Sequence, residues 1–380
     1  MAAGEHAGPA AALAQPIDAI DAFLVRVPLD ERLLVFGKLI SSRDFVIVRV
    51  RAGEYVGTGY AFTRGAALDH AVRDQIAPLV VGQPIAAIHQ GWDAARAAAR
   101  MTGEGGSYAR ALAVVDIARW DLLGQALGVP LWQVWGGVAT PIPCLAIMGY
   151  YREADAVAAL RREAERLAEA GYQWFKIPFG ADAALDQHRL AALREVVGPD
   201  ALIALDAGAA FASVKEASAA WAAVEGYHPA FLEDPFAASA WELAITLAQQ
   251  TQIPIAFGES IASPGTMQRL GRTSGVDIIR PDATHQMGVT GYLRGTAVAR
   301  EAGVRIFPHY FPDLHASLVS AWGGEMIEES PAEVDTVAFR HLRAVQPDIR
   351  AGMWHLSDRP GFGIVWDEAA LQRYRRPSPS

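Results

Sequence analysis

The pattern of apolar and polar positions changes near residue 140, beyond which short β-rich runs alternate with amphipathic helical runs. The apolar runs predict strands over residues 142–148, 173–178, 201–206, 230–233, 254–258, 276–280, 304–308 and, as the weakest, 325–328. Helical periodicity predicts helices over residues 153–170, 182–197, 213–225, 240–250, 263–270, 288–302 and 314–321. Repeated strand–helix units imply a parallel sheet with right-handed crossovers, and about eight units close a TIM barrel. An open doubly wound sheet is the alternative, but neither a G-x-G-x-x-G nor a Walker motif follows the first strand.

The first third of the chain has a different pattern, which is typical of an α+β arrangement. It predicts strands over 17–27 and 44–51, a Gly-rich turn of a hairpin or meander over 53–59, and helices over 66–80, 84–100 and 108–127. The strand assignments depend on β-branched residues, and the last helix ends at the stop signal Gly128-Val129-Pro130. Residues 1–15 are alanine-rich and lack the regions of a signal peptide, so we expect a loose tail there.

Composition and charge narrow the class of protein. Hydrophobic residues make up 52% of the 380 positions and charged residues 20%, which argues against disorder as the main state. The formal net charge of −9 argues against a general nucleic-acid binder. With Cys144 as the single cysteine, one chain cannot build a disulfide framework or a cysteine zinc site. No apolar run reaches the roughly 20 residues of a membrane span, so we expect no membrane partner. The single cysteine fits a reducing cytoplasm, and the net charge leads us to expect no nucleic-acid partner.

Ionisable residues stand at the C-terminal ends of the predicted barrel strands, which is where active sites of TIM barrels lie. Strands two to seven end, in order, at Lys176, Asp206, Glu233, Glu259, Asp282 and His309. The side chains of Asp206, Glu233 and Glu259 should meet at one point, because neighbouring strands carry them. Buried together, they need a cation, and a hard divalent ion with oxygen ligands, Mg²⁺ first, suits them. The alternative is that each carboxylate only caps the helix after its strand.

Several sequence blocks resemble the enolase superfamily, in its mandelate racemase-like branch. They are ALAVVDIARWDLLGQALGVPLWQVWGG (111–137), GYQWFKIP (171–178), LDAGAAF (205–211), FLEDPF (231–236), FGES (257–260), RPDATHQMGVTG (280–291) and FPHYF (307–311). The resemblance implies an α/β fold, a modified TIM-like (β/α)-barrel with an N-terminal α+β capping domain that the C-terminal segment completes. The implied division is a flexible tail over 1–15, the capping domain over 16–138, the catalytic barrel over 139–330 and the returning segment over 331–380.

The resemblance also implies metal-assisted removal of the α proton of a carboxylate substrate. One Mg²⁺ per subunit is implied on the three carboxylates at positions 206, 233 and 259, and a His309–Asp282 pair is implied as acid and base. His309 suits this role because the pKa of a histidine lies near neutral, and Asp282 would orient its ring and raise its basicity. The charge that moves onto the substrate carboxylate as an enediolate needs a metal and nearby cations. His315, six residues further on, is expected to be structural.

Two positions match the family pattern and two depart from it. Lys176 matches the first lysine of the family's K-x-K motif, which implies a catalytic and substrate-binding role. The electrophilic glutamate of the eighth strand matches Glu328, with Glu325 as the alternative register, and Glu328 is expected to hydrogen-bond the substrate. Pro178 stands where the second lysine is expected, so one face of the substrate has lost its base. Gly208 stands where members often carry asparagine, which removes a polar contact near the metal.

Substrate contacts outside the strand ends are harder to assign from sequence. Tyr150 is a candidate substrate-binding residue just past the first barrel strand, together with Tyr151, although both side chains can also serve only to pack beneath the capping domain. Two cap loops are expected to close over the barrel mouth and set specificity, one at 28–42 and the other at 63–66 or 101–107.

The predicted function is dehydration of an acid sugar, an aldonate or aldarate, to a 2-keto-3-deoxy acid, with His309 as the base. A β-elimination can run with one base, whereas racemisation needs groups on both faces of the α carbon, so Pro178 favours dehydration. The alternatives are a racemase or epimerase with an unrecognised second base, such as a tyrosine, and a metal-binding relative without turnover. The expected partner is a small-molecule carboxylate, and the resemblance implies a homo-oligomer.

Overall fold

The computed structural model describes residues 8–35, 37–101, 103–152, 155–272 and 275–377. Its larger sheet contains eight barrel strands: β4 (Ile142–Ile147), β5 (Trp174–Pro178), β6 (Leu202–Asp206), β7 (Phe231–Glu233), β8 (Ile255–Phe257), β9 (Ile278–Ile279), β10 (Arg305–Ile306) and β11 (Ile327–Glu329). Each strand from β4 to β9 pairs in parallel with the next, and β11 pairs in parallel with β4. The predicted strand–helix alternation and TIM-like barrel are therefore confirmed.

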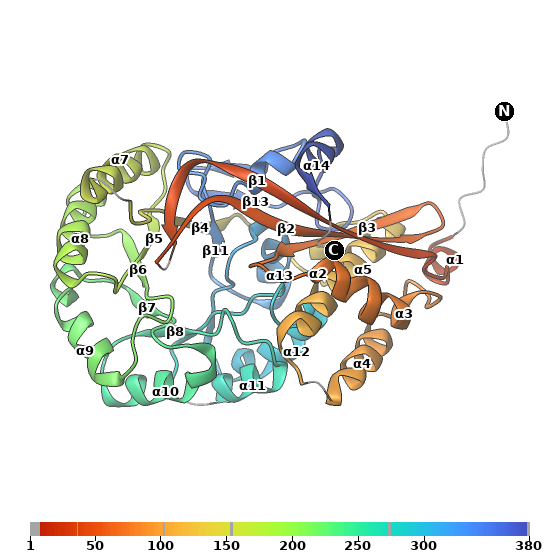
Figure 1. Ribbon diagram of the computed structural model, residues 1–380, viewed down its shortest axis with the longest axis horizontal. Helices are drawn as coiled ribbons and strands as arrows, with labels where there is room; N and C mark the ends of the chain where they lie inside the picture. The colour runs from red at the N-terminus through yellow and green to blue at the C-terminus, as the bar shows by residue number, and fades with distance from the viewer. Residues whose placement is uncertain (1–7, 36, 102, 153–154, 273–274, 378–380) are drawn as a thin grey trace.

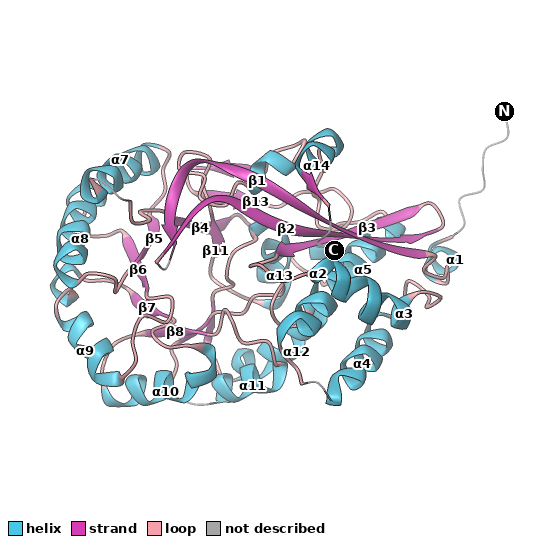
Figure 2. Cartoon of the chain, viewed as in Figure 1, coloured by secondary structure: helices cyan, strands magenta, loops and turns pink. Residues whose placement is uncertain are grey.

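The helices between these strands form the outer wall of the barrel, as the curved row of cyan helices in Figure 2 shows. They are α7 (Ala156–Glu169), α8 (Ala183–Val197), α9 (Val214–Ala222), α10 (Trp241–Gln250), α11 (Pro264–Arg272), α12 (Gly288–Glu301) and α13 (Pro312–Trp322). Two of them begin at side-chain caps, because Asp182 accepts the backbone N–H groups of Ala184 and Leu185, and Ser213 accepts that of Glu216. Because a helix returns the chain after each strand, the C-terminal ends of all the parallel strands lie at the same end of the barrel, its mouth.

A second sheet lies beside the mouth of the barrel (Figure 1). Its strands run in the order β14 (Arg375–Arg376), β1 (Ala19–Val35), β2 (Lys38–Ala52) and β3 (Tyr55–Phe62), all antiparallel. The expected loop at 28–42 is wrong, because β1 and β2 remain paired to Val35 and Lys38 with one irregularity between Pro28 and Leu33. The sequence hid this hairpin because residues 30–32 are charged and exposed and three apolar residues, Leu33 to Val35, follow in a row, so apolar alternation fades there. The expected turn over 53–59 is likewise too long, because β3 begins at Tyr55.

Helices cover one face of this sheet. They are α1 (Pro9–Leu13), α2 (Leu68–Ala71), a π-helical turn (Val72–Ile76), α3 (Ala77–Val80), α4 (Ile88–Ala98), α5 (Gly106–Leu127) and α6 (Leu131–Val134). Helix α5 lies directly on β3: a Cβ on Gly57 would sit 2.1 Å from the carbonyl oxygen of Ala118, and one on Gly59 2.1 Å from that of Val114. The expected tail over 1–15 is wrong from Pro9 onward, because α1 forms and its Ala12 is buried.

The last segment of the chain contacts both sheets. Strand β12 (Asp348–Arg350) pairs with β13 (Met353–His355), which pairs with the first residues of β4 in the barrel. After α14 (Glu368–Tyr374), strand β14 pairs with β1. The hairpin of β1 and β2 therefore arches over the barrel while the end of the chain holds its base (Figure 1). No helix among the described residues is long and apolar enough to span a membrane.

Candidate active site

The three predicted carboxylates meet at the barrel mouth. Asp206 ends β6, Glu233 ends β7 and Glu259 follows β8, and one oxygen atom from each lies within 4.8 Å of the other two. Burial raises the pKa of Asp206 to about 7, with the two neighbouring glutamates adding to the rise and Lys176 opposing it. Within the described chain, the Oε2 atom of Glu233 is buried without a hydrogen-bond partner. A cluster of oxygen donors with one unused buried acceptor fits a hard divalent cation.

Lys176 stands among the same carboxylates from the end of β5. Its Nζ lies 3.2 Å from Asp206, 3.2 Å from Glu233 and 2.6 Å from Glu328. Burial lowers the pKa of this lysine, but the three carboxylates outweigh it and hold the pKa well above the ordinary value. The lysine therefore carries a charge at the point where an enediolate would need one.

The eighth strand brings Glu328 rather than Glu325 into the site. Glu328 ends inside the barrel between Lys176 and the guanidinium of Arg280. Glu325 forms an ion pair with Arg305 at 2.6 Å on the exposed surface. Burial raises the pKa of Glu328, but Lys176 and Arg280 bring it down to about 2, so this side chain is an ionised acceptor at neutral pH.

Arg280 is the residue in this site that the sequence reasoning missed. It lies at the end of β9, fully buried, and its Nε donates to Glu233 at 2.8 Å while its other nitrogens bind Glu328 and the carbonyl oxygens of Phe307 and Pro308. Arginine is usually a surface residue, so its place two positions before Asp282 in an apolar strand is the signal that could have found it. The guanidinium joins a candidate metal ligand to the glutamate of the eighth strand.

His309 and Asp282 form the expected pair. The Nδ1 atom of His309 lies 3.0 Å from Asp282, and Nε2 lies 2.9 Å from Glu259. Burial lowers the pKa of His309, but Glu259, Glu328 and Asp282 together raise it to about 10. His315 is also buried, but its two ring nitrogens contact backbone atoms of Tyr310 and Ala283, which fits the expected structural role.

Pro178 and Gly208 lie where the sequence places them, beside the carboxylates. Pro178 is paired in register with Asp206 and has no proton to exchange. The N–H of Gly208 donates to Asp206 Oδ1 at 3.0 Å, and its φ of +50° favours glycine. Tyr150 does reach the site, where its hydroxyl hydrogen-bonds that of Tyr310 at 2.6 Å. Tyr151 is directed elsewhere, to Asp186.

A cavity of about 630 Å³ joins these groups to the second sheet. Its floor includes Asp206, Glu259, His309, Tyr150 and Tyr310. Its opposite wall comes from the β1–β2 hairpin, from the end of β3 and from the loop over 63–65. The expected cap contribution at 63–66 is therefore present at this cavity, whereas none of the described residues from 101 to 107 lines it.

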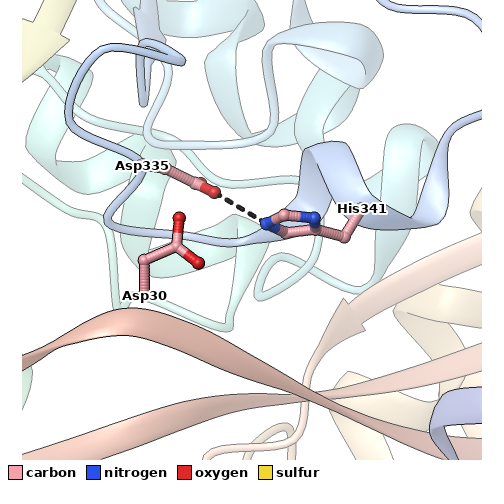
Figure 3. Close-up of side chains that lie close together, drawn as sticks. All are labelled: Asp30, Asp335 and His341. Atoms are coloured by element: carbon pink, nitrogen blue, oxygen red, sulfur yellow. Dashed lines mark hydrogen bonds and ion pairs between the residues drawn. The ribbon is translucent and has the colours of Figure 1, made fainter.

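A second group of side chains of the kinds that bind metals, Asp30, Asp335 and His341, lies at the surface where the hairpin meets the segment after β11 (Figure 3). Asp335 lies 3.1 Å from His341 Nε2 and 2.6 Å from Arg340 Nε, and Arg340 also lies 3.6 Å from Asp30. Arg340 contacts both carboxylates and so links the hairpin to the segment after β11, although exposed ion pairs of this kind contribute little to stability. The buried cluster of Asp206, Glu233 and Glu259 is therefore the better candidate for a metal site.

Comparisons with known proteins agree with this architecture. Residues 22–136 match the family described as mandelate racemase / muconate lactonizing enzyme, N-terminal domain, and residues 159–370 match enolase C-terminal domain-like proteins. Arabinonate dehydratase of Saccharolobus solfataricus is 26% identical over 361 residues, covering 91% of this chain and 95% of that protein. D-galactonate dehydratase of Pectobacterium atrosepticum is 32% identical over 273 residues, 68% of this chain and 67% of that protein. A racemase from Streptomyces coelicolor A3(2), solved with bound magnesium, superposes with a TM-score of 0.87 at 25% identity, covering 95% of this chain and 100% of that one.

Proposed function

Because this chain belongs to the mandelate racemase-like branch of the enolase superfamily, we propose that it is a Mg²⁺-dependent acid sugar dehydratase with His309 as its base. The observation that carries the proposal is the His309–Asp282 pair beside three clustered carboxylates, with His309, Asp206 and Glu259 lining one cavity. The two curated relatives are dehydratases of sugar acids, which supports the same reaction class here.

Asp206, Glu233 and Glu259 would hold the ion. When bound, Mg²⁺ supplies positive charge that polarises the substrate carboxylate and offsets the Glu259 charge that raises the pKa of His309. The racemase from Streptomyces coelicolor carries magnesium in its structure, which supports this choice of metal.

His309 would begin the reaction. Its Nδ1–H donates to Asp282, and this bond orients the ring and leaves Nε2 as the atom that accepts a proton. Nε2 takes the α proton, and the C–H electrons move onto the carboxylate as an enediolate. The electrons then return to form a C=C bond as the β C–O bond breaks, and the departing oxygen takes a proton from the His309 imidazolium, or from another acid, and leaves as water. The resulting enol becomes the 2-keto-3-deoxy acid.

The other charged groups would hold the enediolate. Lys176 places its ammonium beside the candidate metal ligands, where charge develops on the substrate. Glu328 is ionised, so we propose that it accepts hydrogen bonds from substrate hydroxyls and fixes Lys176.

The lack of a second base supports elimination over racemisation. Pro178 cannot exchange a proton. Burial raises the pKa of Tyr150, and burial with the neighbouring Tyr150 hydroxyl raises that of Tyr310 well above 10, so neither phenol is a ready base at neutral pH.

A screen of acid sugars for 2-keto acid formation tests the proposal. With Mg²⁺ we expect turnover of at least one aldonate or aldarate, loss of turnover in excess chelator, and recovery when Mg²⁺ is restored. Exchange of the α hydrogen with solvent deuterium but no dehydration of any acid sugar would indicate a racemase instead. Full activity in excess chelator would overturn the metal assignment.

A further inference from the structure

The cavity wall opposite the carboxylates carries three cations from the second sheet. Lys38 and Arg43 lie on β2, and Arg64 lies in the loop after β3. Within the part of the chain that the structure describes, none of the three forms an ion pair with a carboxylate. Asp44 is the acid on this wall, and Arg26 binds both of its oxygens at 2.6 Å while Arg376 approaches at 3.4 Å. The wall therefore carries a net positive charge. Against the effect of burial, Arg64 adds to His309 in holding the pKa of Glu259 well below its usual value.

Arg43 is held with part of its guanidinium unused. Its Nε donates to the carbonyl oxygen of Thr336 at 3.0 Å, and its guanidinium carbon lies 5.3 Å from the ring centre of Phe62. One terminal nitrogen is buried without a hydrogen-bond partner among the described residues. A buried donor of this kind is costly unless a ligand satisfies it.

The loop that carries Arg64 is fixed from behind. Arg110 on α5 donates to the carbonyl oxygens of Thr63 and Phe62, and the N–H of Thr63 donates to the carbonyl oxygen of Asp44. Arg64 itself has a φ of +48°, a strained conformation for a residue with a side chain. Arg64 is exposed, so the lack of an ion pair is ordinary for it; the fixed backbone and the place on the cavity wall are what suit a binding residue.

We propose that this wall binds a second carboxylate, so that the substrate is a diacid, an aldarate, rather than an aldonate; the inference rests on the proposed function. The reacting carboxylate belongs at the Mg²⁺ end of the cavity. An aldonate would bring a neutral hydroxymethyl group to Lys38, Arg43 and Arg64, whereas an aldarate brings a planar anion that a guanidinium can bind through two hydrogen bonds. The substrate thus differs in class from the sugar acids that the two curated relatives dehydrate.

The test compares substrates of equal chain length: galactarate with galactonate, and glucarate with gluconate. The variants are Arg43→Gln and Arg64→Gln, with Arg49→Gln as control, because Arg49 lies on the same strand but pairs with Glu368 outside the cavity. We expect wild-type kcat/KM to favour the aldarate by more than about 100-fold, and each cavity variant to lose roughly 10- to 100-fold on the aldarate, mostly in KM. The loss on the aldonate should be clearly smaller than the loss on the aldarate, and Arg49→Gln should change neither rate.

Calorimetric binding to the Mg²⁺-loaded protein separates this inference from the proposed reaction. If aldarates bind more tightly than aldonates and Arg64→Gln removes the difference, the second carboxylate site stands even if nothing is dehydrated. Equal affinity for the two acids, or equal losses on both in the variants, would overturn it. A phosphorylated aldonate, such as 6-phosphogluconate, serves as a third ligand, and a clear preference for it would overturn the assignment to a carboxylate.

Discussion

The Lys176 ammonium group forms ion pairs with three buried carboxylates. Two of them, Asp206 and Glu233, are candidate metal ligands, so the lysine competes with a metal ion for them. The variant Lys176→Met should bind Mg²⁺ at least about tenfold more tightly, because a positive charge near the ion is removed. The same variant should lose about 100-fold or more in turnover, because the enediolate loses its cation. Calorimetry with Mg²⁺ and a 2-keto acid assay measure both effects. Lys215→Met on the exposed face of α9 is the control, and weaker Mg²⁺ binding in Lys176→Met would contradict the assignment.

Glu233 offers a second test at the level of one side chain. Glu233→Gln should weaken Mg²⁺ binding by more than about 100-fold, since even supporting residues around a metal are worth 10- to 100-fold. The fold should survive, as judged by circular dichroism. Glu325→Gln, on the exposed side of the barrel, is the matched control. Unchanged Mg²⁺ affinity in Glu233→Gln would mean that the carboxylates do not form one metal site.

The sequence predicted the positions of the strand-end carboxylates, because every strand of a parallel barrel ends at the same mouth. It could not predict where a long side chain reaches. The partners of Arg280 and Arg43 lie far away in sequence, so only the folded chain shows that two glutamates bind the Arg280 guanidinium, whereas one terminal nitrogen of Arg43 has no partner among the described residues.

At the level of secondary structure, the close contact between α5 and β3 packs the helix onto the second sheet. Gly59→Ala should destabilise the protein by roughly 1 to 3 kcal/mol, because a Cβ would lie 2.1 Å from the carbonyl oxygen of Val114 and force the helix away. Gly226→Ala is a suitable control, because nothing lies within 4 Å of its added Cβ. Urea unfolding measures both, and equal midpoints for the two variants would show that α5 does not depend on this close contact.

Strand β11 ends in a second buried glutamate, Glu329, beside the one in the site. Burial raises its pKa to about 8, against 4.5 for an exposed glutamate, with Arg343 opposing the rise. The folded state therefore holds a proton that the unfolded chain releases, so stability from this group falls as pH rises from about 4.5 to 8. Glu329→Gln has no titrating carboxyl group at this position. Its free energy of unfolding, relative to that of the wild type, should therefore rise by about 3 kcal/mol between pH 5.5 and 8.5. A difference that stays constant with pH in urea unfolding would contradict the assignment.

The strands and helices of the barrel were predicted because buried strands and amphipathic helices have distinct periodicities. Residues 28–42, the outer part of the β1–β2 hairpin, were predicted as a loop, whereas its base was predicted as strands over 17–27 and 44–51. The outer part is a two-stranded ribbon with much of its length exposed, where charged residues are tolerated. That ribbon carries two of the three cavity cations, so the part of the chain that we propose to bind the far end of the substrate is also the part that sequence periodicity describes least.

In the whole molecule, the site is formed jointly by two sheets that the chain visits in turn. The barrel supplies the candidate acid–base pair and the candidate metal ligands, and the sheet of β1 to β3 closes the cavity above them. The division into a capping domain over 16–138, a barrel over 139–330 and a returning segment over 331–380 stays a prediction. The pairing of β13 with β4 and of β14 with β1 is consistent with a final segment that joins the two parts.

Proton NMR in heavy water tests most directly whether His309 removes the α proton. Wild-type protein with Mg²⁺ and an acid sugar substrate should exchange the α hydrogen or eliminate, whereas His309→Asn should do neither, with a loss of at least about 100- to 10,000-fold. Substrate should still bind to the variant, because Lys176 and the metal hold its carboxylate. If His309→Asn exchanges the α hydrogen at the wild-type rate, another residue is the base and the proposed mechanism is wrong.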